Sequence, residues 1–283
     1  MLLHRTILKL AALAAALLLS CSDNRTPQPT HSPYEAGALP QLSCAPNLDG
    51  QIDSAELAPA LDVPVHYLVS PSGVTRTVDL VGKVDAQGHQ TWDFGADYVD
   101  DQVATIQATS LSGKWYGASF PGGTFAAPFD AGGTIEAVYA YSSAAITLLG
   151  LASRDPTGPN GQTLLVYDQP IALYRFPLKV GSSYVSVGTI TGGTLHGLPY
   201  AGKDTYQIAV DLSGQVVLEA YTFTQALRVR TVVTTEPSAG QTIVTRQTSF
   251  LFECFGEIAR ATSQPNETSD DFTTAAELRR LGQ

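Results

Sequence analysis

The segment that decides the fold is Val244-Thr-Arg-Gln-Thr-Ser-Phe-Leu-Phe-Glu-Cys254. Phe250 and Phe252 fall on its even-numbered face, whereas Gln247 and Ser249 fall on its odd-numbered face. Side chains of a β-strand point alternately to the two faces of its sheet, so this pattern is typical of a half-buried strand. The segment therefore predicts a strand close to the end of the folded domain.

The same alternation recurs upstream. It is present in residues 206–210 and 227–233, which are followed by predicted turns at Asp211–Gly214 and 236–240. Residues 145–152 are almost entirely apolar, which predicts a strand buried on both faces. Strand-like runs joined by short turns pair with their neighbours, so we expect an antiparallel meander.

A mainly β fold is therefore predicted, with the meander closed into a barrel, half-barrel or sandwich that hides its edge strands. Residues 64–262 form this β-rich domain. We expect an EF-hand-like turn and a short helix in residues 44–63, the helix opening at Asp53. The tail, residues 263–283, is predicted to contain a second short helix from Asp270 to Gly282, because acids lie at its start and bases at its end.

The first 20 residues are typical of a lipoprotein signal peptide. Arg5 and Lys9 precede the apolar stretch Leu10–Leu19, which is too short to span a bilayer. Leu18-Leu-Ser-Cys21 resembles the lipobox of bacterial lipoproteins, so we expect Cys21 to be lipidated and to attach the chain to a membrane. In that family, Ser rather than Asp after the cysteine implies sorting to the outer membrane, with its periplasmic or external face left open.

The segment that follows the anchor, residues 21–43, is polar and rich in proline, which predicts a flexible tether. The chain has 16 Lys and Arg against 26 Asp and Glu, a formal net charge of −10. Binding to a phosphate backbone depends on clustered basic side chains, so this balance argues against a nucleic-acid partner.

Three cysteines are present in the whole chain. Lipidation of Cys21 leaves Cys44 and Cys254, which lie near the two ends of the β-rich domain. An exported chain enters an oxidising compartment, so we expect these two residues to form a disulfide. The alternative is a pair of free, buried thiols.

Residues 45–56 resemble the later part of an EF-hand loop, with Gly50 at the turn position. The candidate calcium ligands are Asn47, Asp49, Gln51, Asp53 and Glu56. Ala45 stands at the first ligand position, where it offers no side-chain oxygen. We therefore favour a turn and a capped helix, in which Glu56 bonds to the Asp53 amide, and retain weak calcium binding as the alternative.

No catalytic constellation stands out. Gly117-Ala-Ser-Phe-Pro121 lacks the second glycine of a serine-nucleophile elbow, and the histidines show no ligand spacing. The acidic stretch 93–101 is interpreted as a solvated loop rather than as an acid–base pair. Aromatic residues gather in residues 92–141, where core packing is the first interpretation and a lined concavity for a ligand is the second.

Several short motifs carry a resemblance to one group of proteins. The lipobox, the Asp49-Gly-Gln-Ile-Asp53 segment, Gly113-Lys-Trp-Tyr116 and Phe252-Glu-Cys-Phe255 are similar to those of uncharacterised Gram-negative outer-membrane lipoproteins. The resemblance implies a location at the outer membrane and a β-rich domain, but it implies no activity. We expect a non-catalytic binding or structural module of the cell envelope, with a hydrophobic ligand or an envelope protein as partner. A hydrolase with a dispersed site and a calcium-binding lipoprotein are the alternatives.

Overall fold

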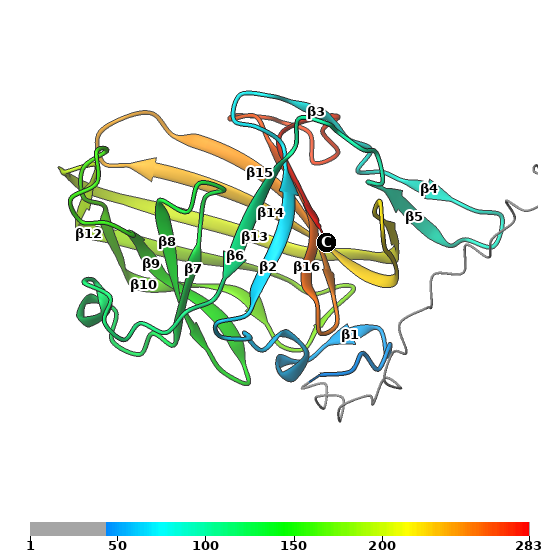
Figure 1. Cartoon of the computed structure of the whole chain (residues 1–283), viewed down its shortest axis with the longest axis horizontal. Coiled ribbons are helices and arrows are strands. Elements are labelled where there is room, and N and C mark those ends of the chain that lie inside the picture. Colours follow the sequence, from blue (N-terminus) through cyan, green and yellow to red (C-terminus); the bar gives the residue numbers. More distant parts are fainter. Residues whose placement is uncertain (1–43, 283) are drawn as a thin grey trace, which may run out of the picture. The chain divides into compact units, whose positions relative to one another are not determined.

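The computed structural model describes residues 44–282, drawn in colour in Figure 1. These residues belong to one compact unit, Ser43–Gln283, which includes both the predicted 44–63 segment and the predicted tail. The predictions for the signal peptide, for Cys21 and for the tether fall on residues 1–43 and lie outside the described residues.

Strands make up most of this unit. They are β1 (Gln51–Ile52), β2 (Pro64–Val69), β3 (Arg76–Thr77), β4 (Lys83–Val84), β5 (Gln90–Asp93), β6 (Gln102–Gln107), β7 (Phe125–Pro128), β8 (Ile135–Tyr141), β9 (Ala145–Ser153), β10 (Leu164–Arg175), β11 (Leu178–Lys179), β12 (Ser183–Leu195), β13 (Leu198–Val217), β14 (Thr222–Pro237), β15 (Ile243–Phe252), β16 (Gly256–Ser263) and β17 (Thr274–Leu281). Two 3-10 turns, η1 (Ser54–Leu57) and η2 (Gly117–Ser119), complete the described elements.

The main sheet is the predicted antiparallel meander. Its strands run in the order β7, β8, β9, β10, β12, β13, β14, β15, β16 and β17, and then continue to β2 and β6 (Figure 1). Apart from the small strand β11, every step from β7 to β17 joins consecutive strands. This order confirms the meander that the short turns indicated.

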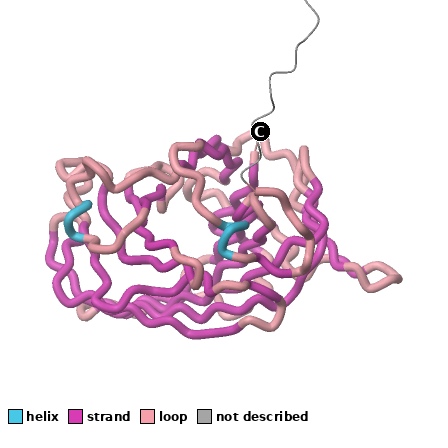
Figure 2. The backbone as a smooth tube through the Cα atoms, turned by 90° about the horizontal axis from the view of Figure 1, so that it is seen from below, coloured by secondary structure: helices cyan, strands magenta, loops and turns pink. Residues whose placement is uncertain are grey.

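The two edges of the sheet, β6 and β7, meet at one point. The amide of Thr109, just after β6, donates to the Ala126 carbonyl at 2.8 Å, and the Ala126 amide donates back at 2.9 Å. The sheet is therefore a nearly closed barrel that curves round an interior, as Figure 2 shows. Closure of this kind protects edge strands from pairing with other chains.

Packing clusters lie on both sides of the sheet. Two outer clusters cover it: one joins β13–β17 to residues 78–94, and the other joins β7–β10 to residues 111–120. Two inner clusters bring opposite walls together: one links Leu251 to Tyr174, and the other links Leu148 to Tyr206. The strand predicted to be buried on both faces is β9, which lies between an inner and an outer cluster.

The predicted helix at 270–282 is wrong. Residues 274–281 form β17, which pairs with β16 on one side and with β2 and β3 on the other. The charges and small residues of this segment suit a helix, but only a strand here satisfies the backbone groups of both neighbours. Tertiary pairing therefore overrides the local preference.

Two smaller predictions also need correction. The predicted helix at Asp53 is only the single 3-10 turn η1, because Pro59 follows it closely and β1 pairs with β11 just before it. The predicted turn at Asp211–Gly214 lies within β13, where irregularities in register after Val210 and Gly214 absorb its residues. The turn at 236–240 joins β14 and β15 as predicted.

Candidate functional site

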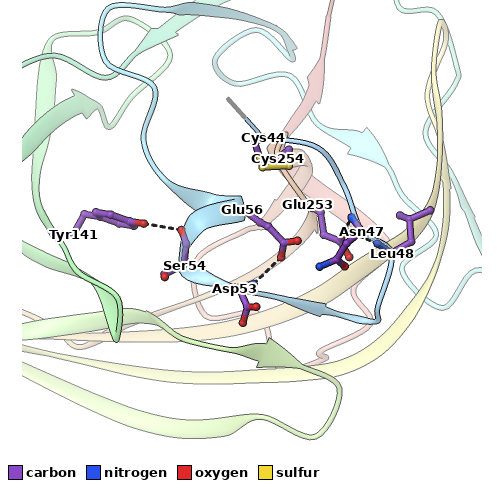
Figure 3. Close-up of a disulfide and its surroundings, with 9 residues drawn as sticks. All are labelled: Cys44, Asn47, Leu48, Asp53, Ser54, Glu56, Tyr141, Glu253 and Cys254. Carbon is purple, nitrogen blue, oxygen red and sulfur yellow. Dashed lines mark hydrogen bonds between the residues drawn. A yellow bond between two sulfur atoms is a disulfide. The ribbon is translucent and has the colours of Figure 1, made fainter. Parts of the chain in front are cut away.

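Residues 44–58, here called the N-terminal plug, lie across one end of the barrel and bury Ile52 and Glu56 there (Figure 1). Ile52 and its neighbour Leu178 are almost fully buried against the inner faces of β13–β15. On the other wall, the Tyr141 hydroxyl of β8 donates to the Ser54 carbonyl at 2.8 Å (Figure 3). The plug therefore joins two walls of the barrel through an apolar contact on one side and a hydrogen bond on the other.

The predicted disulfide between Cys44 and Cys254 is present, and it holds the plug to the turn between β15 and β16 (Figure 3). Its Cα atoms lie 5.6 Å apart. The adjacent Glu253 carboxylate accepts the amides of Asn47 and Leu48, both at 2.7 Å. The Cys254 amide donates to the Glu56 carbonyl at 2.8 Å. The plug is thus held to the turn between β15 and β16 by a covalent bond and by hydrogen bonds.

The five candidate calcium ligands lie within the plug, and side-chain oxygens of three of them, Asn47, Asp49 and Glu56, accept hydrogen bonds from protein N–H groups. Asn47 Oδ1 accepts the Asp49 amide at 2.9 Å, and Asp49 Oδ1 accepts the Gln51 amide at 3.0 Å. Glu56 Oε2 accepts the Asp53 amide at 2.8 Å, which is the bond that the capped interpretation requires (Figure 3). Within residues 44–282, no three His, Cys, Asp or Glu side chains are grouped to hold a metal.

Burial and neighbouring groups both shift the pKa of the Glu56 carboxyl. Its side chain is buried, and this burial raises the pKa of its carboxyl above the usual value, with a further increase from the nearby Glu253 carboxylate. The hydrogen bond from the Asp53 amide acts in the opposite direction, because it stabilises the charged form. The protonated form is therefore favoured more strongly in the folded plug than in an unfolded chain.

Four charged side chains form a second candidate site on the inner faces of β16 and β17. We call Glu257, Arg260, Glu277 and Arg279 the interior charge cluster. Arg260 Nη2 lies 3.2 Å from Glu277 Oε1, and Arg260 Nη1 lies 3.5 Å from Glu257 Oε1. Arg279 Nη2 lies 3.3 Å from the same Glu277 oxygen. One carboxylate oxygen is thus shared by two guanidinium groups.

Contacts with neighbouring strands place this cluster inside the barrel. The Ser249 hydroxyl donates to Glu257 Oε2 at 2.7 Å, and Ser249 shares its face of β15 with Leu251 of an inner cluster. The Tyr67 hydroxyl of β2 donates to the Glu257 carbonyl at 2.8 Å. The cluster therefore faces the same interior as the inner apolar side chains.

Tyrosine side chains line the wall opposite the charges. Burial raises the pKa of Tyr139 to about 12, and the charges of Arg260 and Glu257 also act on this phenol. Burial likewise raises the pKa of Tyr174 far above its usual range, and the negative charge of Glu257 raises it further. Both phenols are partly buried and lie close enough to the charged wall for its charges to act on them.

Three of the four side chains of the interior charge cluster are less tightly covered than those of the apolar clusters on either face of the sheet. The side chains of Glu257 and Arg260 each keep 18% of their surface accessible, and Glu277 keeps 30%. Side chains of the first outer cluster, such as Trp92 and Phe250, are completely buried. Accessible polar surface on inward-facing side chains indicates room for water or a small ligand.

A separate cleft of about 710 Å³ lies outside the barrel, between β4, β5 and the end of β13. Its acids include Asp79 and Asp93, which accept the amides of Gly82 and Gly95, both at 2.9 Å. These carboxylates shape the turns of their own segment. The cleft is therefore a weaker candidate than the interior.

Asp93 ends β5, and the rest of the acidic stretch 93–101 is a loop, as predicted, but the side chain of its last residue is not solvated. Asp101 is buried and accepts a hydrogen bond from Arg76 at 2.8 Å, and it also pairs with Arg280. The Arg280 guanidinium donates to the Phe94 carbonyl at 2.9 Å. These bonds fasten the loop to the outer face of β17.

Sequence reasoning missed the interior charge cluster. Glu277 and Arg279 are separated by one residue and so share a face of β17, but the charge pattern of the segment predicts a helix, in which they would not share a face. Glu257 and Arg260 are separated by two residues, and only the register irregularity between β15 and β16 brings them to one face. The alternation in 277–279 is the one signal that could have indicated the site.

Within residues 44–282, no helix is long and apolar enough to span a membrane. Comparison with protein-family models, curated proteins and solved structures finds no match to the chain. Function is therefore inferred from the sequence and from the chemistry of the barrel interior.

Proposed function

We propose that this chain is a lipid-anchored, non-catalytic binding protein of the cell envelope, and that the interior of its barrel holds a small ligand with an apolar body. The lipobox at Cys21 supports the anchor, and the proline-rich tether supports a domain held away from the membrane. The binding role is supported by the partly accessible side chains of the interior.

That accessibility is the observation on which the proposal depends. Inward-facing groups on β16 and β17 keep accessible surface, and the partly buried side chains of Tyr174 and Tyr206, which pack against the inner clusters, supply apolar surface in the same interior. A ligand that buries such apolar surface gains roughly 25 cal/mol per Å² removed from water. An interior of this kind favours binding over a purely mechanical role.

A matched pair of variants on β14 tests the proposal. Val232 and Val233 are adjacent and partly exposed, but only Val233 faces inward, opposite Tyr206 of β13. Val233→Trp should fill the interior, whereas Val232→Trp adds the same side chain to the outer face.

Uptake of radiolabelled 1-decanol is measured by equilibrium dialysis with the full chain in phosphatidylcholine nanodiscs, and empty nanodiscs provide the blank. We expect saturable uptake by the wild-type chain and by Val232→Trp, with uptake by Val233→Trp reduced about tenfold, as expected when a ligand is excluded sterically. Uptake by all three chains equal to the blank would contradict the proposed function.

A further inference from the structure

Two arginines face each other directly inside the barrel. Arg260 of β16 and Arg279 of β17 are cross-strand partners, and both point to the interior. Like charges in this position repel each other and destabilise the pairing of the strands. Arg279 is only 4% exposed, so water screens this repulsion little. We therefore expect a further interaction to compensate for the repulsion between these two side chains.

The carboxylates beside the two arginines do not satisfy them. Arg279 Nε, Arg279 Nη2 and Arg260 Nε are buried and have no hydrogen-bond partner among the described residues. The contact of Arg279 Nη2 with Glu277 lacks the alignment of a hydrogen bond. One oxygen of Glu257 is already occupied by Ser249. Donors therefore exceed acceptors, and buried unpaired donors are costly.

The electrostatic surroundings shift the pKa values of the two arginines in opposite directions. Burial lowers the pKa of Arg279, and the nearby charge of Arg260 lowers it further, with partial compensation from Glu257 and Glu277. Burial also acts against the charge of Arg260, but the attraction of Glu257 and Glu277 outweighs it and raises the pKa of Arg260. Of the two guanidinium groups, that of Arg279 is therefore the one whose charge is less compensated.

The missing partner is an acceptor with negative charge. A cation is disfavoured, because both carboxylates of the cluster already lie against guanidinium groups. Carboxylate oxygens match the planar donor geometry of arginine. The ring of Tyr67 lies beside Arg279, and the partly buried Tyr174, which packs against an inner cluster, lies close enough to Arg260 to act on its charge. The surroundings thus combine an oxyanion site with an apolar wall.

We propose that the interior charge cluster binds the carboxylate head of an amphiphilic ligand, through Arg279 and Arg260, while the apolar body of the ligand lies against the inner apolar side chains. This inference depends on the proposed function and adds the chemistry of the ligand to it. Arg279 is the principal anchor, and Glu277 is the internal competitor for the same donors.

Decanoate and 1-decanol, which share a chain and differ in the head group, test this inference. Affinities are measured with the full chain in phosphatidylcholine nanodiscs, with empty nanodiscs subtracted. Decanoate should bind more tightly than 1-decanol by roughly 10- to 100-fold, the factor expected for hydrogen bonds to a charged group. Arg279→Met should remove this preference without abolishing uptake of 1-decanol.

Two further variants separate recognition from folding. Glu277→Gln removes the competing carboxylate and should tighten decanoate binding, roughly threefold to tenfold, because a like charge no longer opposes the ligand. This gain keeps the test decisive where Arg279→Met fails to fold. Arg246→Met removes an arginine that pairs with Asp270 and lies outside the interior charge cluster, and it should leave the preference unchanged.

The outcomes are distinguishable. Equal affinities for decanoate and 1-decanol, unaffected by Arg279→Met and by Glu277→Gln, would overturn the carboxylate site and leave the proposed function standing. Uptake of neither compound above the blank would overturn both.

Discussion

The disulfide between Cys44 and Cys254 should contribute strongly to stability. The two cysteines are 210 residues apart in sequence, so the bond closes a loop that includes nearly the whole sheet. The loop-entropy relation gives roughly 5 kcal/mol for a loop of this length. Substitution of both cysteines by alanine should lower the free energy of unfolding by up to this amount and the Tm by roughly 10 to 20 °C.

The fold itself should survive this change at room temperature. Glu253 still holds the plug through the amides of Asn47 and Leu48, and Ile52 remains buried. Urea unfolding followed by tryptophan fluorescence measures the effect, because Trp92 is completely buried and Trp115 is partly buried in the folded chain. Cys44→Ala and Cys254→Ala alone should each match the double variant, since either removes the bond. A loss below about 1 kcal/mol in all three would refute this reasoning.

Three further predictions concern the N-terminal segments. Because folding raises the pKa of Glu56, the protonated state stabilises the plug, and this contribution is lost as the pH rises through the folded pKa. Urea unfolding should therefore show Glu56→Gln gaining stability relative to the wild-type chain between pH 4 and pH 7, and a constant difference would count against it. A palmitate analogue should label the wild-type chain in cells but not Cys21→Ala, and equal labelling would exclude Cys21 as the acylation site. Calorimetric titration of the full chain should give calcium affinity weaker than about 10⁻⁵ M, whereas low-micromolar binding lost in Glu56→Gln would establish the EF-hand-like alternative.

Local patterns in the sequence were sufficient to predict the meander and its strand that is buried on both faces. The alternation in 244–254 and the apolar run at 145–152 depend on which face of a strand is buried, and this is visible in one sequence. The disulfide could also be predicted, because the expected export of the chain and the expected lipidation of Cys21 left Cys44 and Cys254 as one pair. These features follow from short-range chemistry.

Features that depend on distant partners could not be predicted. Residues 274–281 carry the charges of a helix, and only the edges of β16 and β2 make them a strand. The interior charge cluster forms only because the barrel closes and because the register is irregular between Phe250 and Leu251. Neither feature can be predicted from the amino-acid composition. Long-range pairing therefore decided both the end of the fold and its candidate site.

Photo-cross-linking tests most directly whether the barrel interior holds the ligand. The full chain in nanodiscs is irradiated with a decanol analogue that carries a diazirine on its alkyl chain, and the modified residues are mapped by mass spectrometry. The interior site predicts modification of inward-facing residues such as Tyr174, Tyr206 and Val233, with protection by excess decanoate. Modification confined to the outer cleft at Asp79 and Asp93 would contradict it.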